Sequence, residues 1–345
     1  MRSKLYTLIS CCVALLGLQH GYAQGLHFSQ FYNAPMLLNP ANAALMKSED
    51  YRLGINYRTQ WASLPAPYKT FSAYGDCQLF KQNETGELMG NWLGIGGGFF
   101  SDKAGDGELS MTKFQGAIAY HIQVGSFSML SVGLSGGYAQ RSVNFNKLTF
   151  NEQWDGERFD ILLPNGEMDG IVKTQLFDVG AGINYAFFPD EYTYIKIGVG
   201  VDHLNQPEET FFNGTLINKV GIRPTGSIEA LFRLSETFTL NPSAYYTTQS
   251  GASEILFGTN CNIGLGGDEN ATSLILGGFY RYNDAAIGVI GMQWGGMKIM
   301  GSYDYTISSL TPDNKGKGAF EMSVIFRGMY GDMSGPPQNA GCPRF

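Results

Sequence analysis

The sequence is short of charge and, beyond its first 23 residues, of long apolar runs. Charged side chains make up 15% of its 345 residues, and the net charge of -7 comes without a basic stripe or a polybasic segment. This distribution argues against a nucleic-acid surface and against an electrostatic anchor on an acidic leaflet. No later stretch of about 18 apolar residues could cross a bilayer as a helix. If the chain enters a membrane it must do so as a closed sheet, because lipid offers no partner to an unpaired backbone group.

Cysteine is also scarce, and its spacing excludes the usual cysteine chemistry. Five cysteines occur, none in a C-x-x-C pair or at metal-ligand spacing. Removal of the N-terminal leader described below would leave Cys77, Cys261 and Cys342. An odd number in an exported protein argues against a disulfide framework. One bridge or three free thiols both remain open.

The first residues have the features of an export signal. Arg2 and Lys4 precede an apolar run over 5–18, which is too short for a membrane span. Small residues at Gly21 and Ala23 favour cleavage after Ala23, so we predict a signal peptide over 1–23. The lipobox-like Leu8-Ile9-Ser10-Cys11 is the alternative, but cleavage there would leave too short an apolar segment.

What the sequence has in abundance is glycine, aromatic residues and a period-two alternation. It contains 46 glycines and 13% aromatics, and from Phe320 to Arg327 apolar residues alternate with mostly polar ones. Such alternation is typical of a barrel strand with a lipid face and a polar lumen face. We predict an all-β, antiparallel transmembrane barrel of about fourteen strands, near 51–60, 67–80, 90–101, 110–124, 127–141, 172–188, 191–204, 220–235, 236–248, 254–264, 271–283, 285–293, 296–307 and 318–328.

Connection lengths favour a membrane barrel over a soluble sandwich, which would also alternate. The connections near 124–126, 188–190, 235–236 and 295–296 are tight, whereas 142–171 and 203–219 are long. Short periplasmic turns and long outer loops have this asymmetry, and an even strand count places both termini in the periplasm. Two connections break the rule, 81–89 and 283–284.

These features divide the chain into three parts. We expect the signal peptide 1–23, a plug-like segment 24–50 and a barrel 51–345 that ends in a short periplasmic tail. The plug-like segment carries the turn signals Asn33-Ala34-Pro35 and Asn39-Pro40-Ala41. A barrel this wide would leave a water-filled lumen unless a terminus or loops filled it.

No motif predicts catalysis, a cofactor or a metal, so we expect a protein that is not an enzyme. The glycines of 94–98 lack the G-x-G-x-x-G spacing and a following helix. The acidic 102–107 resembles a calcium loop without its closing glutamate. His27, His121 and His203 lie far from any nucleophile motif, and we assign them ordinary hydrogen-bonding roles.

Charges of both signs fall on the face of the strands that should line the lumen. We interpret them as ion pairs that cross-link the interior, with a polar conduit as the alternative. The charges singled out are Arg52, Arg58, Lys113, Arg141, Asp178, Asp304, Glu321 and Arg327. Aromatics such as Tyr57, Trp92 and Tyr138 fit the girdles at the membrane interfaces.

Aromatic residues also gather in the two long outer loops. The candidates for partner binding are Phe145, Phe150, Trp154, Phe159, Phe211 and Phe212. Exposed aromatics in a long loop suit an interface. The alternative is a loop that folds back and caps the barrel.

Short motifs along the whole chain resemble those of the PorP/SprF family of the Bacteroidota type IX secretion system. They are His27-Phe28-Ser29-Gln30-Phe31-Tyr32, Leu38-Asn39-Pro40-Ala41, Asn56-Tyr57-Arg58-Thr59-Gln60-Trp61, 102–107, 137–142, Asp202-His203-Leu204-Asn205-Gln206-Pro207, 280–285, 302–304 and Cys342-Pro343-Arg344-Phe345. The resemblance implies an integral outer-membrane protein of the secretion and gliding machinery with a FadL-like barrel. It implies as partners other secretion components and secreted proteins with C-terminal sorting domains, besides outer-membrane lipid. Whether it serves the core apparatus or a particular secreted protein is left open.

Two other functions compete with docking or export of secreted proteins. A FadL-like channel for hydrophobic small molecules would need a continuous apolar pocket inside, which the inward charges disfavour. A purely structural envelope barrel is the third reading.

Overall fold

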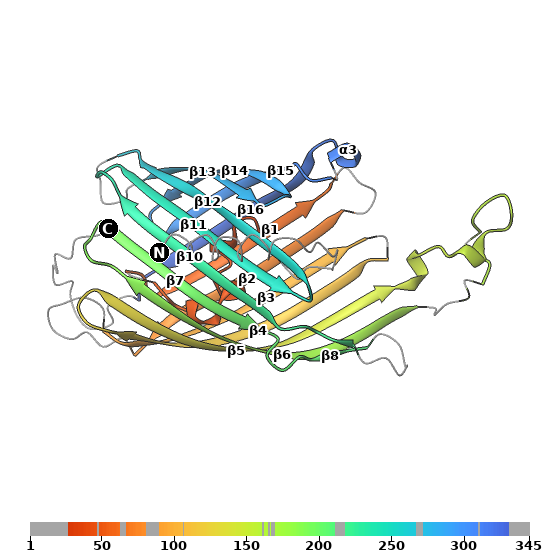
Figure 1. Cartoon of the computed structure of the whole chain (residues 1–345), viewed down its shortest axis with the longest axis horizontal. Helices are drawn as coiled ribbons and strands as arrows, with labels where there is room; N and C mark the ends of the chain where they lie inside the picture. The colour runs from red at the N-terminus through yellow and green to blue at the C-terminus, as the bar shows by residue number, and fades with distance from the viewer. Residues whose placement is uncertain are drawn as a thin grey trace, which may run out of the picture.

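The computed structural model describes residues 27–46, 48–62, 67–80, 90–105, 107–160, 162–164, 166, 170–210, 218–266, 272–309 and 311–330. The predicted signal peptide and the tail 331–345 lie outside these residues. Fourteen antiparallel strands close into one barrel (Figure 1), which confirms the predicted fold class. None of the helices in the described part is long and apolar enough to cross a membrane.

Neighbouring wall strands follow one another in the chain, with two exceptions. The first is the closure of the barrel, where β1 pairs with β16. Between β7 and β10 a short hairpin of β8 (Glu208–Glu209) and β9 (Asn218–Lys219) forms a separate sheet, so that β7 pairs directly with β10. The wall strands are β1 Tyr51–Gln60, β2 Tyr68–Leu79, β3 Trp92–Ala104, β4 Leu109–Gln123, β5 Ser128–Asn144, β6 Ile171–Phe187, β7 Thr193–Asp202, β10 Arg223–Arg233, β11 Phe238–Gln249, β12 Ala252–Gly264, β13 Ser273–Arg281, β14 Ala285–Trp294, β15 Met297–Thr306 and β16 Lys317–Gly328.

The two ends of the barrel differ, though less than the sequence predicts. At the end where β1 begins and β16 finishes, here the turn end, the connections include 124–127, 188–192, 234–237 and 295–296. The opposite end, here the loop end, carries 145–170 and 203–222. The loop end also has tight connections at 105–108 and 250–251, which we did not expect to be so short. The connection 145–170 contains η3 (Phe145–Lys147) and η4 (Asn151–Gln153), and the connection 307–316 contains α3 (Thr311–Asn314).

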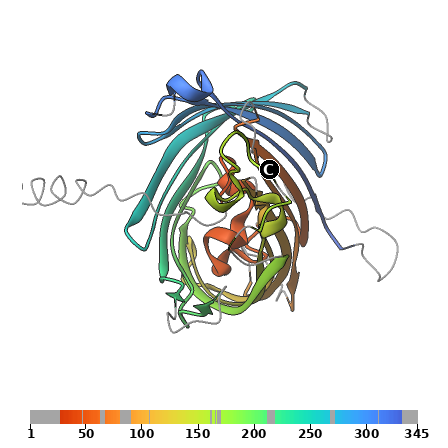
Figure 2. The same cartoon turned by 90° about the vertical axis from the view of Figure 1, so that its right-hand side faces the viewer.

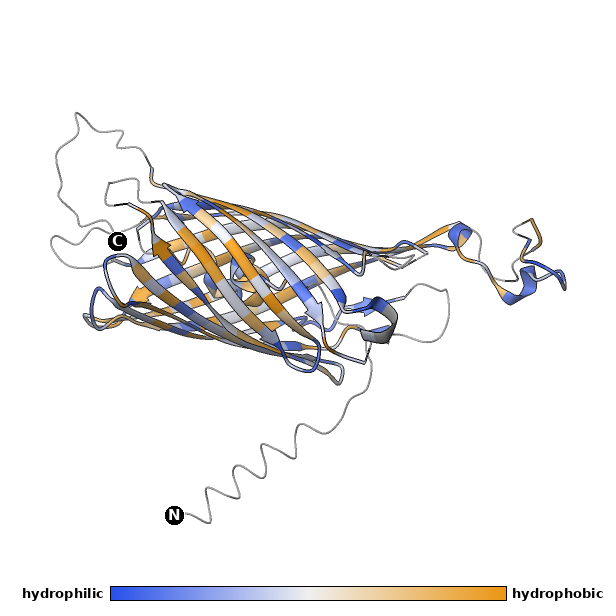
Figure 3. Cartoon of the chain, turned by 90° about the horizontal axis from the view of Figure 1, so that it is seen from above, coloured by the Kyte–Doolittle hydropathy of each residue, from blue (hydrophilic) through white to orange (hydrophobic). Residues whose placement is uncertain are grey.

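Side chains alternate between the two faces of the wall. On β16, Phe320 is 50% exposed on the outside, whereas Glu321 is fully buried inside. Many large apolar side chains of the strands are exposed, among them Leu53, Ile118 and Ile290, on the face where acyl chains would solvate them. Figure 3 shows hydrophobic and hydrophilic residues interspersed along the strands. Trp92 is an exception to the expected girdle. It is buried inside the barrel, and its indole Nε1 donates to the Ala44 carbonyl at 3.0 Å.

The N-terminal segment 27–46 lies inside the barrel (Figure 2). It consists of three single turns: η1 (Phe31–Asn33), α2 (Pro35–Leu38) and η2 (Pro40–Asn42). Proline is well suited to the first helical position, because its fixed φ fits and its missing N–H would have no partner there. The Asn39 side chain accepts from the Ala41 N–H at 2.8 Å and caps η2. We call residues 27–46 the plug.

Candidate functional site

A charge cluster holds the start of the plug near the loop end. It consists of five buried side chains from five strands: Arg58, Glu254, Arg281, Asp304 and Glu321. The Arg58 guanidinium lies 3.0 Å from Asp304 Oδ2 and 3.2 Å from Glu321 Oε2. Arg281 Nη1 lies 3.1 Å from Asp304 Oδ2, and Arg281 Nε lies 3.0 Å from Glu254 Oε1. Buried charges are tolerated only when paired in this way.

The plug supplies donors that complete this cluster. The backbone N–H groups of Ser29 and Gln30 donate to Glu321 at 2.8 and 2.9 Å. The Ser29 hydroxyl donates to Asp304 Oδ2 at 2.7 Å and accepts from Arg281 Nη2 at 2.7 Å. Hydrogen bonds to carboxylates are among the stronger ones in proteins. The plug and the wall therefore form one network.

Beyond the cluster, the plug covers an apolar stretch of the inner wall on β11 to β15. Phe31 is buried there, and its ring centroid lies 4.8 Å from that of Tyr245 and 6.2 Å from that of Phe279. The wall residues of this patch are Tyr245, Leu256, Ile275, Phe279, Ala285, Ile287, Val289 and Met300. An apolar surface thus exists inside the barrel, but part of it is occupied by the chain itself.

The second half of the plug rests on glycines of the opposite wall. A Cβ added at Gly133 would lie 2.4 Å from the Ala41 nitrogen, and one at Gly200 would lie 2.4 Å from the Leu38 carbonyl oxygen. Gly182 likewise leaves room for the Asn39 amide. Backbone atoms cannot yield as a flexible side chain can, so only glycine permits this approach. We call the inward glycines at 94, 133, 182 and 200 the glycine cradle.

Polar contacts fix the plug toward the turn end. The Ala44 N–H donates to Asp76 Oδ2 at 2.6 Å, and the same carboxylate pairs with Arg52. The His121 ring lies 2.9 Å from the Ala43 carbonyl oxygen and 2.7 Å from the Ser131 hydroxyl. The plug thus crosses the lumen from the charge cluster to the start of β1.

The remaining predicted charges lie on the inner face as well. Lys113 contacts Asp178 at 2.8 Å, and the His203 ring contacts the other oxygen of that carboxylate at 2.8 Å. Arg141 pairs with Glu209 of β8 at 2.9 Å, and Arg327 lies 3.8 Å from Glu49.

Sequence reasoning missed Arg281 and Glu254, which complete the charge cluster. Arg281 stands between Tyr280 and Tyr282. Because both neighbours are apolar and face outward, alternation could have indicated that Arg281 faces inward.

The described residues of the connection 145–170 extend away from the barrel rather than folding over it (Figures 1 and 3). At its far part Trp154 and Phe159 form an isolated β-bridge, with ring centroids 5.0 Å apart in an edge-to-face arrangement. They are 48% and 52% exposed. The fold-back alternative therefore does not apply to the described residues of this loop. Phe211 and Phe212 lie outside the described residues.

The base of this loop is tied to the neighbouring hairpin. The rings of Phe145 and Phe150 stack with their centroids 6.3 Å apart. Glu108 lies 2.6 Å from both Lys103 and Lys147, and hydrogen bonds from these two ammonium groups, Lys103 first, lower the pKa of Glu108.

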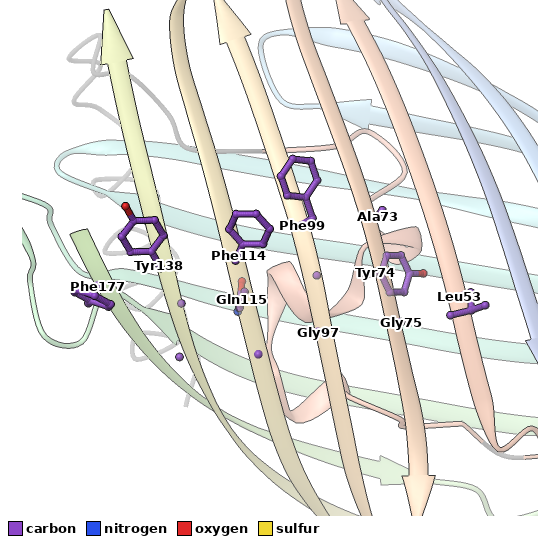
Figure 4. A pocket seen from close by; sticks show the side chains of 14 residues that line it. Leu53, Ala73, Tyr74, Gly75, Gly97, Phe99, Phe114, Gln115, Tyr138 and Phe177 are labelled. Atoms are coloured by element: carbon purple, nitrogen blue, oxygen red, sulfur yellow. The ribbon is translucent and has the colours of Figure 1, made fainter. Parts of the chain in front are cut away.

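A groove of about 800 Å³ runs across the outer wall from β1 to β6 (Figure 4). Its floor is a row of outward glycines that pair in register, Gly75, Gly97, Gly116 and Gly136. Aromatic residues lie along one side of it, namely Phe99, Phe114, Tyr138 and Phe177. The groove faces the bilayer, so it differs from the internal pocket that a channel for hydrophobic molecules would need.

Among the residues that the structure describes, no group of three or more His, Cys, Asp or Glu side chains could hold a metal ion. Cys77 and Cys261 are free and half-buried, and Cys342 lies outside the described residues.

Comparison with known proteins adds a family and a fold. A family model described as type IX secretion system membrane protein PorP/SprF matches residues 20–326. The crystal structure of the P. putida toluene transporter TodX is similar, with a TM-score of 0.50 and 8% identity over 87% of this chain and 95% of that one. A Pseudomonas aeruginosa FadL homologue has a TM-score of 0.49 and 10% identity over 85% and 94%. At such identities the likeness to TodX shows the fold alone. No curated protein sequence matches.

Proposed function

This chain belongs to the PorP/SprF family of type IX secretion system membrane proteins, and from that premise we propose that it docks secreted proteins at the outer membrane. In this proposal it is a component without enzymatic activity that helps to export proteins or retain them at the surface. Its partners are other secretion components, secreted proteins with C-terminal sorting domains, and the surrounding lipid.

The observation that carries the proposal is the Trp154 and Phe159 pair at the far part of the long loop. Both rings are about half exposed although the barrel offers lipid and lumen surfaces that could cover them. Tryptophan and other aromatics anchor protein interfaces when they stand in rigid elements. The Asp155 carboxylate accepts from the Glu157 and Arg158 N–H groups at 2.8 Å, which fixes the turn between the two rings.

The plugged lumen supports docking over passage through the barrel. Residues 27–46 are held by the charge cluster, the apolar wall and the glycine cradle at once. A folded protein could not pass without removing them. We therefore propose that secreted proteins bind at the loop end. In this proposal the loop end faces the outside of the cell, and the termini lie in the periplasm.

The test is the double substitution Trp154→Ala with Phe159→Ala. Removal of two half-exposed anchors should reduce surface retention of a dependent exported protein by roughly tenfold or more, since each anchor contributes more than about 1 kcal/mol in typical interfaces. Surface proteins of intact cells would be compared by quantitative mass spectrometry. The matched control is Phe80→Ala, which removes an exposed aromatic at the turn end. An unchanged surface protein set in the double variant would refute loop docking.

A channel for hydrophobic small molecules is the second candidate, favoured by the apolar inner wall under Phe31. It requires that the plug move aside. Uptake of a labelled fatty acid by vesicles that contain the purified protein would support the channel, whereas the absence of uptake would contradict it.

A further inference from the structure

Strand β6 is longer than the neighbour that should cover it. It pairs with β5 along its whole length, from Ile171 to Phe187. Its pairing with β7 covers only Ala181 to Phe187. On the β7 side, therefore, residues 171–180 have no strand partner in the described part of the chain.

The backbone groups that face this open edge can be identified. The Phe188 N–H donates to Phe127, before β5, so even-numbered residues of this strand point toward β5. The Leu204 N–H donates to the Val179 carbonyl at 2.9 Å, so odd-numbered residues point toward the β7 side. The open edge therefore presents the N–H and C=O groups of residues 171, 173, 175, 177 and 179.

The lower part of the edge is capped by the side chain of Asn205. Its Oδ1 accepts from the Val179 N–H at 3.2 Å, and its Nδ2 donates to the Phe177 carbonyl at 2.7 Å. The chain reaches this place through His203, whose φ of +59° turns it out of the β7 line. The Asn205 side chain thus makes two of the hydrogen bonds that a neighbouring strand would make to β6.

The position of the cap follows from the membrane. Phe177 is 70% exposed and belongs to the aromatic row beside the outer groove. Unpaired backbone groups are costly in lipid but are hydrated in water. The cap therefore ends where the outward side chains change from Phe177 to the exposed Gln175 and Lys173.

The inner side of this stretch is already covered. Leu176 packs with Ala139 and Val220 in a buried cluster, and Glu209 of β8 pairs with Arg141. Glu209 of β8 and Val220, directly after β9, thus contact inward side chains of β5 and β6, and β8 and β9 pair with each other in a separate sheet. In the described part of the chain, no segment of its own extends the sheet at this edge.

We propose that residues 171–176 of β6 accept an extended strand of a partner protein, which continues the sheet beyond Asn205. The inference rests on the proposed docking function and specifies how the partner binds. An open edge is a template for strand addition, in which backbone hydrogen bonds supply affinity. The exposed Lys173 favours an acidic side chain on the added strand, and Gly170 links this edge directly to the aromatic loop. A lipid cannot supply alternating N–H and C=O groups, so the occupant is a peptide.

The test compares Gln175→Pro with Gln175→Ala. Proline removes the N–H that points to the open edge and leaves the ladder to β5 intact, whereas alanine removes the side chain and keeps the N–H. We expect Gln175→Pro to lower surface retention of the protein that depends on Trp154 and Phe159 roughly tenfold, the effect of one to two backbone hydrogen bonds. Gln175→Ala should retain it. The amount of folded barrel in the outer membrane is measured for each variant.

The outcomes separate this inference from docking itself. Retention in Gln175→Pro, with loss in the Trp154 and Phe159 variant, would overturn strand addition and leave docking in place. The reverse pattern would support strand addition at β6 and refute docking through the aromatic loop. An equal loss in Gln175→Ala would point to a side-chain contact and overturn the inference. If Gln175→Pro fails to assemble, hydrogen exchange of the backbone amides decides whether a partner strand binds at this edge. The amides of Lys173 and Gln175 should exchange more slowly in wild-type protein captured with its partner than alone, and slow exchange without a partner would contradict the proposal.

Discussion

Arg58 stands at the centre of the charge cluster, and its removal should be costly. It pairs with both Asp304 and Glu321, and all three side chains are almost fully buried. Arg58→Leu would leave the carboxylates with less compensation in a site that water does not reach. Breaking a buried ion pair from one side typically costs about 3–5 kcal/mol. We expect a loss of this size in the free energy of unfolding, measured by urea titration of the barrel in lipid vesicles.

The matched control is Lys103→Met at the loop end. Lys103 pairs with Glu108, but both side chains are substantially exposed. Exposed pairs contribute about 0–1 kcal/mol, so this variant should remain close to wild type. An equal effect of the two substitutions would show that burial does not set the strength of the Arg58 pairs.

The sequence could predict the inward position of these charges but not their partners. Alternation alone places Arg58, Asp304 and Glu321 on the lumen face. Which strands come together depends on the closure of β1 against β16, a contact between residues more than 260 positions apart. The role of Ser29 could not be predicted at all, because a serine in an irregular segment has no periodicity that points to a partner.

At the level of elements, the plug and the glycine cradle form one fitted pair. The prediction of a plug-like segment came from proline and asparagine turn signals. Pro35 and Pro40 do begin turns and Asn39 caps one, whereas Asn33 caps none. The contact with the cradle was not predictable, because alternation assigns a glycine to one face of a strand but does not show which segment approaches it. Gly133, between the outward Val132 and Leu134, faces the plug, whereas Gly136 faces outward on the same strand.

This pair of glycines provides a matched test of the cradle. In Gly133→Ala the new methyl group would collide with the backbone of Pro40 and Ala41, so the plug must shift. Overpacking of this kind costs about 1–3 kcal/mol. We expect a higher ion conductance of the barrel in planar bilayers and faster amide exchange over residues 41–46. Gly136→Ala meets no atom within 4 Å and should leave both measurements unchanged. Wild-type conductance in Gly133→Ala would mean that the cradle does not hold the plug.

At the scale of the whole molecule, the wall is uneven in height. β5 and β6 reach further than the other strands and lead into the long loop (Figure 1). The opposite part of the wall ends in tight connections such as 250–251 and 282–284. The side of the barrel with the longer strands therefore carries the aromatic pair, the open edge of β6 and the β8 and β9 hairpin in one region. The loop lengths in the sequence indicate this region, but the break between β6 and β7 became visible only with the strand register.

The orientation of the barrel decides whether that region can meet an exported protein. In the proposed orientation, the loop end with the longest loops faces outward and the turn end faces the periplasm. An epitope inserted at 156–157, in the turn between Trp154 and Phe159, should be labelled by antibody on intact cells. The same epitope at 235–236, in a tight connection of the turn end, should be labelled only after the outer membrane is permeabilised. Labelling in the opposite order would place the aromatic loop in the periplasm. The partners would then have to be periplasmic components of the secretion system, because a surface-retained protein could not reach the loop.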